Sequence, residues 1–239
     1  MTKKEEWLAG TRSAVPIMLG YVPVGIAYGV MARQAGLNTW QTVLMSLTVY
    51  GGASEMMAAG MVAQGAAVLT IVLTTFILNL RHIIMSTCVF NQMQGGRLPV
   101  RMLAAFGVTD ETFAVYTTTA NAPRTPRYFF SMALCSYLSW ALGSWLGAIA
   151  TGLLPPLITA ALGISLYGMF IGLLMTGLHG NGRLAALVVL TALCNTVLCN
   201  VVQLDSGWSM ILSTLGCAAL GSFFVTPNAV GEENSHAEP

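Results

Sequence analysis

The chain has 239 residues, of which only 8% are charged, and its formal net charge is +1. A soluble domain carries about 25% charged residues, so a water-exposed fold is excluded, and the near-zero charge gives no reason to expect a nucleic-acid partner. The mean hydropathy is +0.71, and the apolar residues form runs of about 20, the length that crosses roughly 30 Å of hydrocarbon as a helix. The sequence therefore predicts an all-α integral membrane protein.

About eight membrane-embedded helical segments are predicted, joined by short connections. A cytoplasmic N-terminal stretch (1–12) precedes one polytopic domain (13–226), and an acidic tail (227–239) is expected to be disordered. The predicted segments, in chain order, are 13–32, 40–62, 66–90, 98–119, 128–150, 157–178, 184–202 and 208–225.

The first segment carries Pro16, Gly20 and Pro23. Because proline removes a backbone donor and clashes with the carbonyl four residues earlier, this spacing predicts a helix broken between the two prolines. Freed amides and carbonyls at such a break can bind a carboxylate or an ion. A simple kink that binds nothing is the alternative.

The second segment contains the run Tyr50-Gly51-Gly52-Ala53-Ser54-Glu55 near its middle. The two glycines weaken the helix and allow another backbone to come close. A carboxylate at this depth needs a cation, a proton or a polar partner. The bland alternative is a protonated or paired glutamate with a structural role.

The third segment carries Asn79, Arg81 and His82. Arginine keeps its charge and must pair or reach the interface, whereas histidine titrates near neutrality and is a candidate proton relay. Snorkelling to the headgroups is the alternative.

The fourth segment is less apolar and contains Asp110 and Glu111 after Thr109, a plausible N-cap. A polar interfacial loop is the alternative. If this segment crosses the membrane, the N-terminal side holds six of the nine basic residues other than Arg81, which favours a cytoplasmic N-terminus. If the segment is re-entrant, the opposite orientation has the same excess of basic residues inside.

Pairing is the least costly way to keep these ionisable groups in a bilayer, since each isolated charge costs at least about 2.5–3.5 kcal/mol. We therefore expect the groups to converge on one polar cavity beside the break in the first helix. The candidate charge and proton-coupling network is Glu55, Arg81, His82 and Asp110, with Glu111 beside it. The candidate substrate-binding residues are Pro16, Gly20, Pro23, Tyr50, Gly51, Gly52, Ser54, Glu55, Asn79, Asp110 and Glu111.

The five cysteines all lie in apolar runs without a CxxC pair. They are interpreted as packing residues, with disulfides or a zinc site as alternatives. No motif predicts a cofactor, and no metal site is assigned.

These motifs resemble those of the AzlC family of branched-chain amino acid exporters. The resemblance covers about the first half of the chain, where the proline-rich first helix, the run 50–55, Leu80-Arg81-His82 and the run 106–113 follow in the family's order. One departure is Glu55, since family members often carry glutamine there.

The resemblance implies a multi-pass protein of the bacterial inner membrane that exports neutral apolar amino acids such as Val, Leu, Ile and Met, coupled to protons. It also implies a small hydrophobic AzlD-like partner of about 100 residues, enough for about four spans of ~20 residues and their loops.

Two other functions stay open at this point. One is an intramembrane serine protease with Ser54 as nucleophile and His82 or His179 as base, although Glu55 would oppose negative charge developing beside it. The other is a channel or structural membrane subunit. An inverted repeat is also possible, on the weak echo of Tyr28-Gly29 in Tyr167-Gly168.

Overall fold

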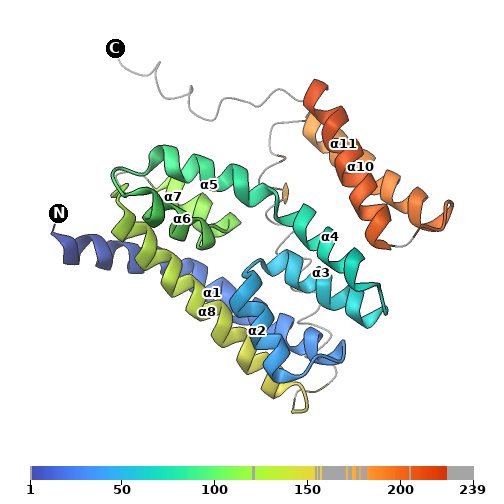
Figure 1. The fold of residues 1–239 in the computed structure, drawn as a ribbon, viewed down its shortest axis with the longest axis horizontal. Coiled ribbons are helices and arrows are strands. Elements are labelled where there is room, and N and C mark those ends of the chain that lie inside the picture. The colour runs from blue at the N-terminus through green and yellow to red at the C-terminus, as the bar shows by residue number, and fades with distance from the viewer. Residues whose placement is uncertain are drawn as a thin grey trace. The chain divides into compact units, whose positions relative to one another are not determined.

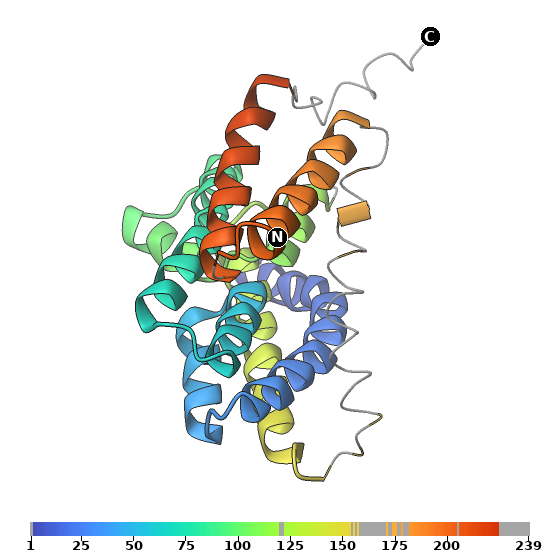
Figure 2. The same cartoon turned by 90° about the vertical axis from the view of Figure 1, so that its right-hand side faces the viewer.

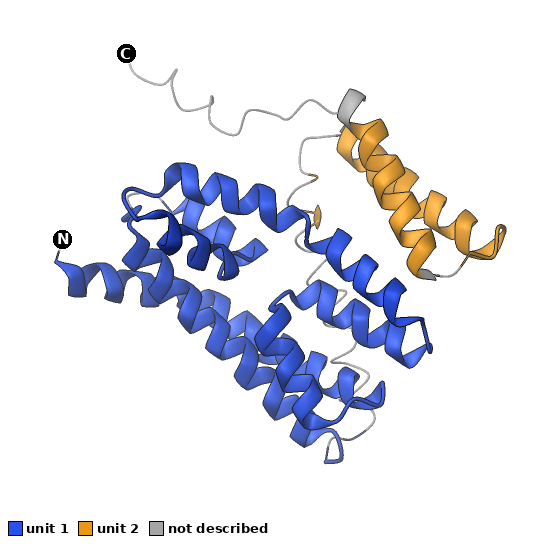
Figure 3. Ribbon diagram, in the orientation of Figure 1, with its two compact units in different colours: residues 1–170 blue, residues 171–239 orange. Residues whose placement is uncertain are grey.

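The computed structural model describes residues 2–119, 122–153, 182–204 and 206–224, with isolated positions 155, 157, 171, 174, 175 and 178. The described residues form helices and no strand, which confirms the all-α prediction. The chain divides into two compact units, Met1–Phe170 and Ile171–Pro239, each described by itself (Figure 3). The predicted segment 157–178, the echo at 167–168 and the tail 227–239 fall wholly or largely outside the described residues.

Unit 1 contains eight described helices. They are α1 (Lys3–Gln34), α2 (Thr39–Val49), α3 (Gly52–Ala63), α4 (Val68–Asn79), α5 (Arg81–Gln92), α6 (Leu98–Phe106), α7 (Asp110–Thr118) and α8 (Pro126–Ala150). Three stretches of this unit are long and apolar enough to cross a membrane, namely α1, α4 with α5, and α8.

The helices α1 and α8 lie side by side and run in the same direction (Figure 1). A Cβ on Gly10 would meet Ser131 and Tyr128 at the start of α8, whereas a Cβ on Gly29 would meet Ser144 and Ala148 near its end. Small residues let helix backbones approach closely where lipid, not water, is the solvent. This glycine-lined contact is the axis on which the rest of unit 1 is built.

The predicted break in the first helix is wrong. The helix α1 continues from Lys3 to Gln34 through Pro16 and Pro23. Both prolines are exposed, as is Gly20 between them, so they lie on the face turned away from the core. Because α1 is held against α8 along its length, the packing of the opposite face maintains the helix where proline removes its own hydrogen bonds.

The segment 98–119 is a helical hairpin that returns to the end where it began. The amide of Gln94, before the segment, donates to the carbonyl of Arg124, after it, at 2.6 Å. Arg124 also donates to the Thr117 and Thr119 carbonyls at the end of α7. Both ends of the hairpin therefore lie beside the start of α8, as expected of a re-entrant segment.

The segment 40–62 forms a second hairpin from the other end. Its start at Asn38 follows the end of α1, and α2 runs antiparallel to α8, with Ser46 bonded to Ser144 and Tyr137 to the Leu47 carbonyl. The stretch Val68–Gln92 crosses once and finishes beside the start of α8, so its own start lies at the opposite end, where α3 must finish. Figure 1 shows α3 running back from the end of α2.

Unit 1 thus combines three stretches that are long and apolar enough to cross a membrane with two hairpins that start from opposite ends. Each hairpin arm has 9 to 12 residues, or about 14–18 Å, so each hairpin reaches about the middle of a 30 Å hydrocarbon layer. Seven of the eight predicted embedded segments are helical in the described residues, but two of the seven fold back as hairpins. Figure 2 gives the same helices from the side.

Unit 2 contains the described helices α10 (Gly182–Asn200) and α11 (Ser206–Phe224). They form an antiparallel pair, because Ser209 bonds Asn195 across the connection while Gly221 packs on Leu187 at the far end. This pair corresponds to the last two predicted segments.

Candidate functional site

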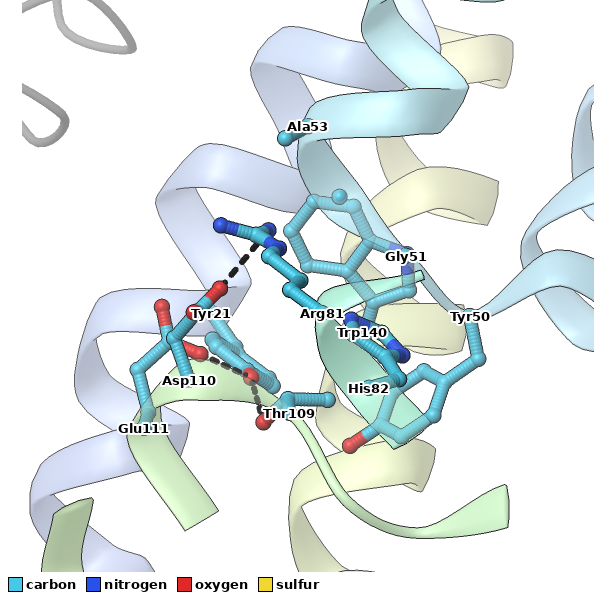
Figure 4. Close-up of a pocket in the computed structure, with 11 residues that line it drawn as sticks. Tyr21, Tyr50, Gly51, Ala53, Arg81, His82, Thr109, Asp110, Glu111 and Trp140 are labelled. Carbon is cyan, nitrogen blue, oxygen red and sulfur yellow. Dashed lines mark hydrogen bonds and ion pairs between the residues drawn. The ribbon is translucent and has the colours of Figure 1, made fainter. Parts of the chain in front are cut away.

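Three helices begin at one cavity near the middle of unit 1. These are α3, α5 and α7, and the two hairpins meet there tip to tip (Figure 4). The cavity has a volume of about 30 Å³, room for about two water molecules. It is lined by Tyr21, Tyr50, Gly51, Gly52, Ala53, Arg81, His82, Thr109, Asp110, Glu111 and Trp140.

The tip of the α2–α3 hairpin is shaped by Tyr50 and Gly51. Tyr50 ends α2 in the left-handed region, with φ 46°, a conformation that costs energy for a non-glycine residue. A Cβ on Gly51 would lie 2.6 Å from the Ser54 hydroxyl and 3.1 Å from the Asn79 amide oxygen. A larger residue here would push the Ser54 and Asn79 side chains aside, so the absence of a side chain lets the start of α3 pack closely against the end of α4.

The tip of the α6–α7 hairpin is a capping box. The Thr109 hydroxyl accepts from the Thr112 amide at 3.3 Å, and the Thr112 hydroxyl accepts from the Thr109 amide at 2.8 Å. Thr112 also donates to the Gly107 carbonyl at 2.9 Å. These bonds start α7 at Asp110, as the N-cap predicted from the sequence requires.

An ion pair joins two of the three helix starts at the cavity, those of α5 and α7. Arg81 Nη2 lies 2.8 Å from Asp110 Oδ2, with the two side chains 43% and 30% exposed. The pair links the first residue of α5 to the first residue of α7 and forms the more exposed part of the cavity wall. The pair gives Arg81 and Asp110, one base and one acid of the predicted network, a partner of opposite charge.

Glu111 is held differently from Asp110. Tyr21, on α1, donates its hydroxyl to Glu111 Oε2 at 2.6 Å and shares a 2.7 Å bond with the Thr109 hydroxyl. Within the described part of the chain, Asp110 has an ion-pair partner and Glu111 has none. Glu111 therefore brings an uncompensated carboxylate to the cavity.

Glu55 lies behind the cavity and does not line it. The side chain is fully buried, Oε1 accepts from the Gly51 amide at 2.9 Å, and Oε2 accepts from the Trp140 indole at 3.3 Å. The expected convergence of all five ionisable groups is thus met by Arg81, His82, Asp110 and Glu111, while Glu55 connects to the cavity through the residues that it holds. Glu55 also lines a separate, mainly apolar cavity of about 340 Å³ with Ser54.

Aromatic side chains make the buried wall of the cavity. Trp140 packs edge-on against Tyr21 at 5.4 Å and is stacked on Tyr28 at 6.0 Å between ring centroids. Tyr50 packs edge-on against Tyr137 at 4.9 Å. In the described residues the buried Tyr50 hydroxyl makes no hydrogen bond, so it is available to a ligand.

The remaining predicted site residues lie elsewhere. Pro16, Gly20 and Pro23 are exposed on α1 and do not line the cavity. Ser54 is buried, and its hydroxyl donates to the Gly51 carbonyl at 2.7 Å. The side chain of Asn79 packs close to Gly51. His179 lies outside the described residues.

Tyr21 and Trp140 were missed by the sequence reasoning. Tyr21 sits between the two prolines, which drew attention to the backbone and away from the side chain. Trp140 is one of several aromatic residues in an apolar run, and nothing local distinguishes it. Their polar atoms, a phenol and an indole N–H that need partners when buried, were the available signal.

No group of three metal-ligating side chains occurs among the residues that the structure describes. The five cysteines are free thiols there.

A sequence model described as "AzlC protein" matches residues 16–154. The chain is similar to an uncharacterized membrane protein of Archaeoglobus fulgidus, with 32% identity over 78% of this chain and 82% of the relative. It is also similar to the inner membrane protein YgaZ of Escherichia coli, with 28% identity over 77% of this chain and 78% of the relative.

A further relative is the branched-chain amino acid transport protein AzlC of Bacillus subtilis, which is 27% identical over 62% of this chain and 61% of its own length. No solved structure matches the chain.

Proposed function

Because this chain belongs to the AzlC family and is a membrane transporter, we propose that it exports branched-chain or other neutral apolar amino acids, such as Val, Leu, Ile and Met, in exchange for protons. The observation that carries this proposal is the meeting of three helix starts and an unpaired carboxylate at one cavity. Such a site offers opposite charges at short range, which is what a zwitterion requires.

The substrate carboxylate binds at the start of α3. The first amides of a helix lack partners within the helix, and the helix dipole places partial positive charge there. Gly52 and Ala53 line the cavity at this point, and Tyr50 adds an unpaired hydroxyl. Broken helices bind substrate carboxylates in this way in other transporters.

The substrate ammonium binds Glu111. The carboxylate of Asp110 is already neutralised by Arg81 at 2.8 Å, and that of Glu55 is enclosed by two N–H donors. Glu111 keeps only the Tyr21 hydroxyl, so it has the most to gain from a cation. Glu55 and Asp110, the other candidate carboxylates, are therefore not assigned to the ammonium.

The conformation described here is closed. A volume of about 30 Å³ is far below the roughly 300–1,000 Å³ of ordinary ligand sites. Since the tips of the two hairpins form part of the cavity wall, separating these tips is the simplest way to admit a substrate. The Arg81–Asp110 pair joins α5 to the α6–α7 hairpin and must open or move with it.

The N-terminus lies in the cytoplasm. The start of α1 and α8 forms the end of unit 1 that is rich in basic residues, and the other end has Arg33. The basic residues at the rich end are Lys3, Lys4, Arg12, Arg97, Arg101, Arg124 and Arg127. Lysine and arginine are retained on the cytoplasmic side, which supports this orientation more strongly than the sequence count did. A small AzlD-like membrane subunit completes the transporter.

The serine protease alternative loses support. The Ser54 hydroxyl donates to the Gly51 carbonyl and lies outside the cavity that His82 lines. The site offers no pairing of these two groups that would activate a nucleophile.

Vesicle counterflow tests the proposed function. The chain is reconstituted with and without a small membrane subunit of AzlD type, and the entry of labelled Leu, Val, Ile and Met is compared with that of Lys and Glu. We expect Glu111→Gln to abolish uptake, whereas Glu5→Gln, a matched change at the exposed start of α1, leaves it intact. Equal uptake by both variants would refute the ammonium site, and no uptake of any apolar amino acid by the native pair would refute the substrate class.

A further inference from the structure

A groove follows α6 and α8 from the basic end of unit 1 toward its middle. It consists of two cavities of about 690 and 270 Å³ that share Leu103, Phe130 and Leu134. The outer cavity is also lined by Trp7, Gln94, Gly95, Gly96, Val100, Thr125, Pro126 and Arg127. The inner cavity is also lined by Ala104, Phe106, Gly107, Ala133 and Tyr137. Together these residues define the α6–α8 groove.

The groove is polar at its outer end and apolar beyond it. Arg127 lines the outer end, and Arg101 reaches the same place by donating to the Gly95 carbonyl at 3.3 Å. In the described residues Arg101 Nε is buried without a partner. Glu6 is the acid found here, 3.6 Å from Arg127, so the mouth of the groove carries a net positive charge.

The length of the groove fits one leaflet. Along α8 it extends from Pro126 to Tyr137, about 17 Å at 1.5 Å per residue, which is close to half of the ~30 Å hydrocarbon layer. Trp7, 45% exposed, lies at the outer end, where tryptophan is enriched in membrane proteins because its ring favours the headgroup level.

The inner end of the groove is closed. Tyr137 donates to the Leu47 carbonyl at 2.7 Å, and α2 covers α8 from there, with Ser46 bonded to Ser144. The exposed apolar face of α8 continues past this point through Leu138, Leu142 and Ile149, but the hollow formed by the two cavities stops at Tyr137. A single acyl chain needs no more than the length of these two cavities.

We propose that the α6–α8 groove binds one anionic phospholipid. Its phosphate lies at Arg101, Arg127 and the Gly95–Gly96 turn, and one acyl chain lies between α6 and α8 on Leu103, Phe130 and Leu134. Basic pockets between membrane helices on the cytoplasmic side suit anionic headgroups. The chain end reaches Phe106 and Gly107, just before the Thr109–Glu111 turn, so the lipid supports the hairpin that carries the candidate site. This inference does not depend on the proposed substrate.

Thermal unfolding of the delipidated full chain in neutral detergent tests the proposal. Phosphatidylglycerol is compared with phosphatidylcholine of the same acyl chains, and we expect phosphatidylglycerol to raise Tm by about 2–4 °C more, the shift that ~1 kcal/mol of binding produces in a protein of this size. Arg101→Gln with Arg127→Gln should remove that difference, while Arg33→Gln, at the other end of α1, should keep it.

A second variant fills the groove without changing charge. Leu134→Trp should reduce phosphatidylglycerol bound to the native protein, counted by native mass spectrometry, at least threefold. Leu138→Trp is the control, since Leu138 is 55% exposed one turn further along α8 and does not line the groove. Equal Tm shifts for the two lipids on the native protein would overturn the proposal, as would full phosphatidylglycerol binding by Leu134→Trp.

Discussion

Glu55 is fully buried with an N–H donor on each carboxylate oxygen. A glutamine side chain has one oxygen acceptor in place of two, so in Glu55→Gln its NH₂ group would face either the Gly51 amide or the Trp140 indole N–H. Because that leaves a buried donor without an acceptor, the free energy of unfolding should fall by about 1–3 kcal/mol. A glutamine also cannot take up a proton. We expect the variant to fold, to transport, and to lose the pH dependence of transport, measured as counterflow between pH 5 and 8. A pH profile like that of the native protein would exclude Glu55 from proton coupling.

Arg81 and Asp110 form a pair whose side chains are partly exposed. Their coupling free energy should therefore be about 1 kcal/mol, between the values of surface and buried pairs. Arg81→Ala strands the Asp110 carboxylate and should lower both Tm and yield, and adding Asp110→Asn should restore most of the loss. A double-mutant cycle from thermal melts measures this. Additive effects of the two substitutions would mean that the pair does not hold the hairpin.

At the scale of elements, the α1–α8 contact depends on glycine where the backbones touch. A Cβ on Gly29 would meet the Ser144 carbonyl oxygen and lie 2.7 Å from the Ala148 amide nitrogen, and backbone atoms cannot turn aside. Gly29→Ala should therefore cost about 1–3 kcal/mol by overpacking. Gly20→Ala is the matched control, with nothing within 4 Å, and should be neutral or stabilising by up to ~1 kcal/mol. Equal melting temperatures for the two variants would contradict the packing described.

The elements also show where local reasoning succeeds and fails. The two-glycine run after Tyr50 and the Thr109 cap both mark real helix boundaries, because turn and cap preferences act over a few residues. Pro16 and Pro23 do not mark one. A helix supported along one face by a long partner tolerates the lost hydrogen bonds, and that partner lies more than 100 residues away in the sequence.

At the scale of the whole molecule, the two hairpins make a prediction about membrane sidedness. In a chain whose native cysteines are replaced, single cysteines at Leu37 and Ala67 should react with an impermeant maleimide from one side of the membrane. Cysteines at Gln94 and Ala122 should react from the other side. Labelling of positions 94 and 122 from opposite sides would show that the segment 98–119 crosses.

The sequence alone determined the membrane setting, the all-helical fold and most of the polar residues at the cavity. These follow from hydropathy, length and the cost of burying charge, which are properties of a segment taken by itself. The sequence identifies seven of the cavity residues as candidates, namely Tyr50, Gly51, Gly52, Arg81, His82, Asp110 and Glu111.

Only the tertiary structure decided whether a segment interrupted at its middle continues or returns. Glycines and caps end a helix, but the direction of the next helix depends on distant contacts such as the bond from Gln94 to Arg124. Contacts between distant segments, such as the packing of α1 on α8, also bring Tyr21 and Trp140 to the cavity and leave Glu55 behind it. Long-range packing sets these positions, because the place of a side chain in the cavity depends on how its helix packs against neighbouring helices.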